Sequence, residues 1–199
     1  TEQFNMRVPD LIDAAHKVQE AFDVDFARRM AQTFELDQRE TYKQLSLGMK
    51  SMVTAILSLA SKAPVLLLDE PVLGFDPVMR EQFNTLLYES YTVQERIIII
   101  STHLVDEIAQ VTEKLIVLDK GKIRLQTDIV EIDEHAYTLT GPQDALLPLV
   151  ETLNCIEKTT TGPILSARIY DKRVEAPDGV TLKRLSLQDF FVALVGGQS

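Results

Sequence analysis

The sequence is short of several features that particular functions require. It holds one cysteine, Cys155, among 199 residues, so an intrachain disulfide and a zinc site built from several thiolates are both excluded. A single cysteine is compatible with a reducing, cytoplasmic setting. The longest apolar runs, Ala63–Leu68 and Ile97–Ile100, are far shorter than the roughly 20 residues of a membrane-spanning helix. If the protein works at a membrane, another chain is expected to cross it.

Basic residues are also in the minority. The chain has 20 Lys and Arg against 30 Asp and Glu, which gives a formal net charge of −10 and a pI of about 4.8. Binding to DNA or RNA phosphates needs concentrated positive charge, so this balance predicts that nucleic acid is not a partner. With 45% hydrophobic and 25% charged residues, the composition is that of a globular protein with a sizeable core.

Helical and strand patterns alternate over the first two thirds of the chain. Continuous apolar runs at Pro64–Leu68 and Ile97–Ser101 predict strands buried on both faces, as in the centre of a parallel sheet covered by helices. Apolar spacing predicts helices within residues 10–34 (two), from about 46 to 60, at 77–91 and from after His103 to about 111, and a hairpin of 115–118 with 123–126. This order indicates an α/β layered core.

The character of the sequence changes after about Glu131. Turn signals at Gly141-Pro142, Gly162-Pro163 and Pro177-Asp178-Gly179 separate short segments. We expect strands at 137–139, 155–159 and 164–170 and helices at 144–153 and 187–195. The pattern predicts a small α+β appendage over residues 132–199.

Asp69 and Glu70 form the strongest local signal. They follow the apolar run Val65–Leu68, and carboxylates at the carboxyl end of a buried parallel strand lie where α/β folds bind ligands. Asp69 can hold a magnesium ion while Glu70 orients and deprotonates an attacking water. The alternative is a strand that ends at a solvated acidic turn.

Three further residues could contact phosphate. Ser46 and Gly48 begin a predicted helix, whose N-terminal N–H groups favour anions; the alternative is that Ser46 is an ordinary N-cap. His103 follows the second strand, so it is expected beside Asp69 and Glu70 and could donate a hydrogen bond to a terminal phosphate oxygen. The alternative for His103 is a polar residue in a strand-to-helix loop.

Together these elements resemble the ABC transporter ATPase family. Leu45-Ser46-Leu47-Gly48-Met49 corresponds to the family signature, usually Leu-Ser-Gly-Gly-Gln, and Leu66–Pro71 looks like the Walker B segment with its catalytic glutamate. Gly74-Phe75-Asp76-Pro77 is similar to the D-loop, and Ser101-Thr102-His103 matches the switch-histidine loop. The resemblance spans residues 4–127, and the form Leu-Ser-x-Gly-Met is similar to bacterial exporter-type ATPases.

The chain departs from the family at one decisive point. The P-loop, Gly-x-x-x-x-Gly-Lys-[Ser/Thr], does not occur in the 199 residues, and the only Gly-Lys pair, Gly121-Lys122, lies in the predicted hairpin. Leu47, Met49, Val72-Leu73 and Phe75 also replace the usual residues of their motifs. In terms of the family, we expect a C-terminal portion of the ATPase subunit: a partial P-loop NTPase core with a helical subdomain and an α+β appendage, inactive on its own.

The resemblance implies site residues and partners. It makes Glu70 and His103 catalytic, Asp69 the Mg²⁺ ligand, and Ser46, Gly48 and Asp76 contacts to ATP. Two ATPase subunits, identical or different, would pair head to tail and drive a transmembrane permease from the cytoplasmic face of the cell membrane. Residues 1–62 would form the helical subdomain, 63–131 the C-terminal part of the ATPase core, and 132–199 the appendage.

Two other functions stay open at this point. The chain could belong to an ABC-type ATPase that is not a transporter, such as a translation factor or a DNA-repair protein, although no second cassette, basic linker or long coiled coil is present in it. It could also be a dimerisation and regulatory module without enzymatic activity. A P-loop encoded immediately upstream would separate a portion of an enzyme from a binding module.

Overall fold

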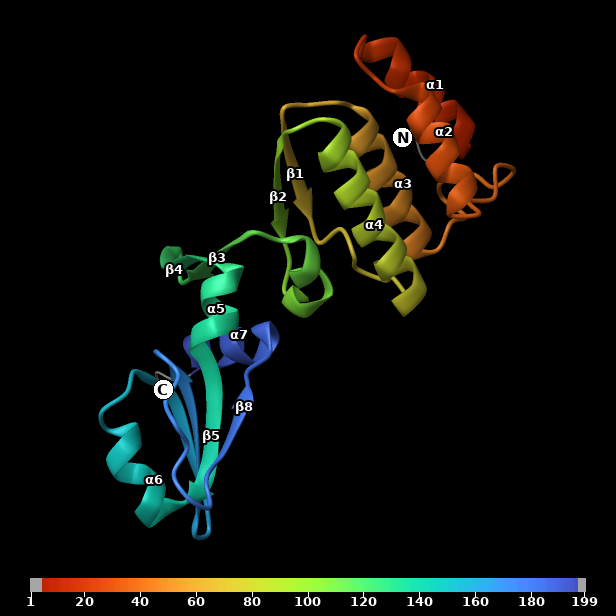
Figure 1. Ribbon diagram of the computed structural model, residues 1–199. Helices are drawn as coiled ribbons and strands as arrows, with labels where there is room; N and C mark the ends of the chain where they lie inside the picture. The colour runs from red at the N-terminus through yellow and green to blue at the C-terminus, as the bar shows by residue number, and fades with distance from the viewer. Residues whose placement is uncertain (1–4, 197–199) are drawn as a thin grey trace. The chain divides into compact units, whose positions relative to one another are not determined.

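The structure is a computed structural model that describes residues 5–196. The chain divides into two compact units, residues 1–107 and 108–199 (Figure 1). The division between helical subdomain, ATPase core and appendage that the sequence suggests stays a prediction.

Within its described residues, 5–107, the N-terminal unit contains four α-helices and two strands. Helices α1 (Val8–Val18), α2 (Val24–Thr33) and α3 (Leu47–Ala60) precede strand β1, and α4 (Pro77–Val93) lies between β1 and β2. Ser46 caps α3, since its hydroxyl oxygen accepts a hydrogen bond from the Met49 N–H at 3.2 Å. Asp76 caps α4 in the same way, followed by Pro77 at the first helical position. These local signals explain where both helices start.

Strands β1 (Val65–Asp69) and β2 (Ile97–Ser101) are parallel neighbours, as predicted. Their register pairs Val65 with Ile97 and Asp69 with Ser101, so the carboxyl ends of both strands meet at one edge. Figure 1 shows α3 and α4 side by side next to this pair.

The prediction that both strands are covered on each face is wrong for the described residues. Leu66 and Leu68 are buried, whereas Val65, Leu67, Ile97 and Ile99 are between 51% and 72% exposed. The exposed side chains alternate with the buried ones along β1, because successive side chains of a strand point to opposite faces. The described chain therefore covers one face of the pair and leaves an apolar face open.

Two details of the helices differ from the prediction. The first helix begins at Val8 rather than near residue 10, its buried positions are Val8 and Ile12, and Val18 at its end is 82% exposed. The segment after His103 forms two short 3₁₀ turns, Val105–Glu107 and Ala109–Val111, in place of an α-helix. Each turn is closed by a backbone hydrogen bond between residues three apart, from the Glu107 N–H to the Leu104 carbonyl and from the Val111 N–H to the Ile108 carbonyl, and such turns are common connectors.

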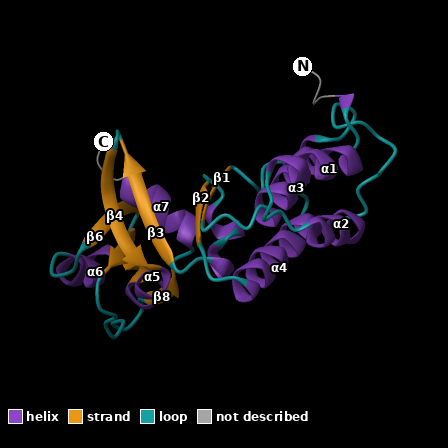
Figure 2. Cartoon of the chain, turned by 90° about the horizontal axis from the view of Figure 1, so that it is seen from above, coloured by secondary structure: helices purple, strands orange, loops and turns teal. Residues whose placement is uncertain are grey.

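The C-terminal unit is an α+β structure built around an antiparallel sheet. It begins with the predicted hairpin, β3 (Lys114–Asp119) with β4 (Lys122–Asp128), and continues into α5 (Ile129–His135). The four-stranded sheet has the order β6-β7-β5-β8, with strands β5 (Ala136–Pro142), β6 (Cys155–Thr161), β7 (Ile164–Tyr170) and β8 (Thr181–Arg184). Helices α6 (Gln143–Val150) and α7 (Leu187–Gly196) complete the unit; Figure 2 colours helices and strands separately.

The sheet of this unit supports two clusters of buried side chains. In one cluster, Leu146 of α6 packs with Tyr137, Leu139 and Ile169 of the sheet. In the other, Ala136 at the start of β5 packs with Ile132 of α5 and Phe190 of α7. The C-terminal unit thus has its own core. Strand β8 was not predicted, since its sequence Thr-Leu-Lys-Arg is short and polar, as edge strands often are.

Candidate active site

Glu70 follows directly after β1 and is held in an unusual backbone conformation. Its φ of 45° lies in the left-handed region, which costs a residue with a side chain about 1 kcal/mol or more. The backbone N–H of Glu70 donates to the Ser101 carbonyl at 2.7 Å, which continues the β1–β2 pairing by one step. Strain of this kind is typical of functional sites, where the surrounding contacts hold it in place.

The Glu70 carboxylate receives three hydrogen bonds from the loop after β2. The Thr102 hydroxyl donates to Oε2 at 2.9 Å, the His103 backbone N–H donates to Oε1 at 3.2 Å, and His103 Nδ1 lies 2.7 Å from Oε1. An ionised carboxylate can accept about four hydrogen bonds, so one lone pair is left, and it is on Oε2. This is where a water molecule can be oriented.

Burial and hydrogen bonding act in opposite directions on this carboxylate. Partial burial raises the pKa of Glu70, but the hydrogen bonds from His103 and Thr102 outweigh it and leave the pKa below the usual value for glutamate. At neutral pH Glu70 is therefore ionised and can accept a proton.

His103 contacts Glu70 through one ring nitrogen only. Its side chain is 63% exposed, and Nδ1 makes the ring contact with Glu70. Among the described residues no second partner is found for the ring, so Nε2 is the nitrogen that can reach a ligand. The predicted neighbourhood of Glu70 and His103 at one sheet edge is confirmed.

Asp69 is the last residue of β1 and is exposed next to Glu70. In the part of the chain that the structure describes, no group of three or more His, Cys, Asp or Glu side chains is arranged to hold a metal ion. Mg²⁺ in nucleotide sites is usually bound by one or two carboxylates together with phosphate oxygens and water. A single carboxylate at the strand end fits that donor set.

The first turn of α3 packs directly on the turn that follows Glu70. A Cβ atom added to Gly48 would lie 2.5 Å from the Gly74 carbonyl oxygen, closer than real contacts allow. Gly74 itself has a φ of +82°, and a Cβ atom added there would lie 3.1 Å from Leu47 Cγ. The Ser51 hydroxyl donates to the Leu73 carbonyl at 3.2 Å. Gly48 is therefore required for the close approach of two backbones.

The described contacts of Ser46 and Asp76 are those of helix caps. Each side-chain oxygen accepts a hydrogen bond from an N–H of its own helix, and neither touches the Glu70 carboxylate within the described residues. Their predicted contact with ATP stays a prediction. Sequence reasoning missed the role of Thr102 in holding Glu70, although Thr102 lies inside the Ser-Thr-His motif and could have been found there.

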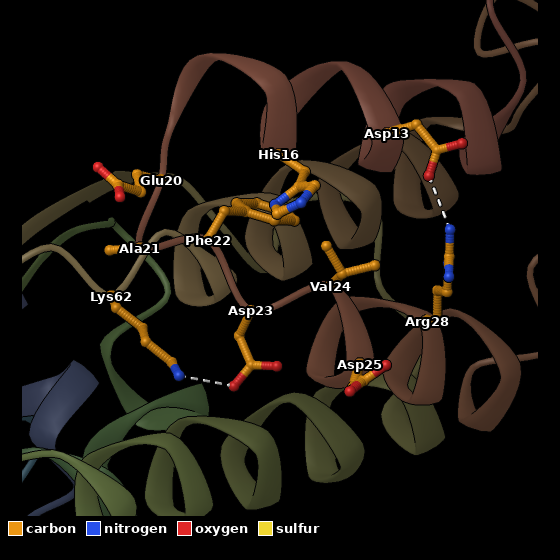
Figure 3. Close-up of a pocket in the computed structure, with 10 residues that line it drawn as sticks. All are labelled: Asp13, His16, Glu20, Ala21, Phe22, Asp23, Val24, Asp25, Arg28 and Lys62. Carbon is orange, nitrogen blue, oxygen red and sulfur yellow. Dashed lines mark hydrogen bonds and ion pairs between the residues drawn. The ribbon is translucent and has the colours of Figure 1, made fainter.

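A pocket of about 630 Å³ lies apart from these residues, beside α1 and α2 (Figure 3). Two ion pairs cross its lining: Arg28 with Asp13 at 2.8 Å, and Lys62 with Asp23 at 2.9 Å. Ten residues line it, none of them a predicted site residue: Asp13, His16, Glu20, Ala21, Phe22, Asp23, Val24, Asp25, Arg28 and Lys62. The candidate active site is the open strand edge and not this pocket.

Comparison with known proteins places the chain in a family. Residues 2–108 match the family described as "AAA domain, putative AbiEii toxin, Type IV TA system". The chain belongs to this AAA-domain family. The match covers β1, β2 and the loops that carry Glu70 and His103.

Similar curated proteins are ATP-binding subunits of ABC transporters. The chain is 27% identical over 124 residues to the ABC transporter ATP-binding protein YtrB of Bacillus subtilis (strain 168), covering 62% of this chain and 41% of YtrB. It is 25% identical to the bacitracin transport ATP-binding protein BcrA of Enterococcus faecalis, covering 81% of this chain and 58% of BcrA. The resemblance to ABC ATPases is confirmed, while the exporter-type assignment stays a prediction.

Solved structures agree in fold. A structure described as "ATP binding subunit of ABC transporter" matches 65% of this chain and 55% of its own, with a TM-score of 0.56 at 19% identity. A second, of a cobalt transport ATP-binding protein (cbiO-2), matches 87% of this chain and 61% of its own, with a TM-score of 0.57 at 20% identity. The chain spans 41% to 61% of the length of the first three curated relatives that it matches. Along the described residues, no helix has the length and apolar character to cross a membrane.

Proposed function

We propose that this chain contributes the catalytic carboxylate and switch histidine to an ATP-hydrolysing subunit of an ABC transporter. The observation that carries the proposal is the environment of Glu70 at the carboxyl edge of two parallel strands. Its backbone has a strained, left-handed conformation, and its carboxylate is held by Thr102 and His103. The order of the four motifs and the names of the relatives support the same function.

The geometry suggests how each residue acts. Glu70 accepts a proton from the water that attacks the terminal phosphorus of ATP, and the bond to the ADP oxygen breaks as the new bond forms. His103 holds Glu70 through Nδ1 and presents Nε2 to the terminal phosphate. Asp69 would hold Mg²⁺ together with phosphate oxygens, and the ion would supply positive charge that stabilises the phosphates as they react.

The remaining phosphate contacts are proposed to come from a second ATPase subunit and from a P-loop. Ser46 and Gly48 at the start of α3 would contact the ATP of a second ATPase subunit, whose signature turn serves this chain in return. Asp76 is proposed to lie at the same interface. The coupled partner would be a transmembrane permease, with the ATPase subunit on the cytoplasmic face of the membrane. A P-loop must be supplied to grip the phosphates, since these 199 residues contain none.

The proposal is tested on the full-length gene product that contains these residues. Phosphate release is expected from Mg²⁺-ATP, and Asp69→Asn should lower it at least about a hundredfold because the ion loses its carboxylate. Glu81→Gln, an exposed position on α4, is the matched control and should leave the rate unchanged. No ATP-dependent phosphate release, or normal release by Asp69→Asn, would contradict the proposal.

A further inference from the structure

Side chains of α4 reach the loops on both sides of the Glu70–His103 pair, and the function proposed above does not use them. The Arg80 guanidinium donates through Nε to the Phe75 carbonyl at 3.2 Å and through Nη1 to the carboxylate of Glu107. The Asn84 amide donates to the backbone carbonyl of Glu107 at 2.8 Å. One helix thus holds two loops at once.

The two loops are the ones that carry the catalytic pair. Phe75 lies in the turn that starts at Glu70, and Glu107 lies four residues after His103 in a 3₁₀ turn. The Glu70–His103 contact joins the loops at one end, and the Phe75–Arg80–Glu107 contacts join them at the other. Two attachments limit the relative movement of the loops far more than one does.

The choice of arginine matches this task. Its planar guanidinium has five fixed N–H donors, so a single side chain can serve a carbonyl and a carboxylate in different directions. The Arg80 and Glu107 side chains are 30% and 33% exposed, which places their ion pair partly out of water. Asn84 adds a neutral donor to the same residue, so that both the side chain and the backbone of Glu107 are held.

We propose that Arg80 is a positioning residue that ties the turn after Glu70 to the loop carrying His103, with Asn84 fixing the far end of that loop. This inference rests on the proposed function, because positioning matters only if Glu70 and His103 act on ATP. Holding reacting groups in place before the substrate arrives lowers the entropic part of the barrier.

The first test follows amide hydrogen exchange in the 199-residue chain. Arg80→Met keeps the length of the side chain and removes its donors, and exchange at His103 and Glu107 is expected to rise about tenfold. Amides of β1 and β2 should change much less. Arg80→Lys keeps the charge opposite Glu107 and should give an intermediate value, while Glu81→Gln should match the wild type.

The second test measures ATP turnover by the full-length gene product. Arg80→Met should lower kcat about tenfold to a hundredfold with KM for ATP unchanged, because it displaces reacting groups without touching the phosphate grip. If exchange at His103 is unchanged, or rises equally throughout the N-terminal unit, Arg80 does not tie the two loops together. A local rise in exchange with a normal kcat would overturn the positioning role. Absence of turnover in the wild type would instead contradict the proposed function. The exchange result would still decide whether Arg80 ties the two loops together.

Discussion

Gly48→Ala tests how closely the first turn of α3 packs on the turn that contains Gly74. The new Cβ would lie 2.5 Å from the Gly74 carbonyl oxygen and 3.2 Å from its carbon, and both atoms belong to the backbone, so a side-chain rotation cannot relieve the clash. Forcing a methyl group into such a contact costs about 1–3 kcal/mol. Replacing glycine by alanine in a helix returns at most about 1 kcal/mol. The N-terminal unit should therefore lose about 1–2 kcal/mol of stability.

Hydrogen exchange measures this loss locally. Destabilisation by 1–2 kcal/mol corresponds to a roughly 5- to 30-fold faster exchange of the most protected α3 amides. Gly196→Ala is the matched control, since nothing lies within 4 Å of the position where its Cβ would be placed. It should leave exchange in the N-terminal unit unchanged. Equal or slower exchange of α3 in Gly48→Ala would refute the close packing of the two glycines.

Three further predictions concern nucleotide affinity, pH dependence and association. Calorimetry should show that the 199-residue chain binds ATP with a Kd no tighter than roughly millimolar, because the chain lacks a P-loop. A few hydrogen bonds of about 1 kcal/mol each cannot offset the translational and rotational freedom that the ligand loses. A micromolar Kd would contradict this prediction. The hydrogen bond from the Phe26 N–H and the pairing with Lys62 lower the pKa of Asp23, so its stabilising effect is complete above the unfolded pKa and is lost as pH falls through the lower folded value. Urea unfolding should therefore show Asp23→Asn less stable than wild type by under about 1 kcal/mol at pH 7. The difference should disappear as pH falls through the lowered folded pKa of Asp23, and a difference that stays constant with pH would argue against the charge effect. The exposed apolar face of β1 and β2 should cause self-association, measured by light scattering. Leu67→Lys should weaken this association, whereas the control Val18→Lys, on the exposed surface of α1, should not. A wild type that stays strictly monomeric at high concentration would rule the association out.

The proximity of Glu70 and His103 was predictable because it follows from topology. Continuous apolar runs before Glu70 and before His103 indicate parallel strands, and the carboxyl ends of such strands meet at one edge. The caps of α3 and α4 were equally visible as Ser46 and as Asp76 with Pro77.

Other features depend on contacts that a single sequence does not record. The same apolar runs do not reveal which face of the strands is covered, because Val65 and Leu66 are alike in character and differ only in their neighbours. The Arg80–Glu107 contact joins isolated charges 27 positions apart. Where a helix was predicted after His103, the first short 3₁₀ turn ends at Glu107, and side chains of α4 bond to this residue, a contact that the sequence pattern does not record.

The central claim is that Glu70 removes a proton from the water that attacks ATP. Glu70→Gln in the full-length gene product keeps the size of the side chain and removes the base, so ATP should still bind with near wild-type affinity while phosphate release falls about a hundredfold or more. The direct measurement is phosphate release at saturating ATP, with bound nucleotide determined in the same samples. ATP bound but not hydrolysed is the result expected of a catalytic base, and normal turnover by Glu70→Gln would contradict the account.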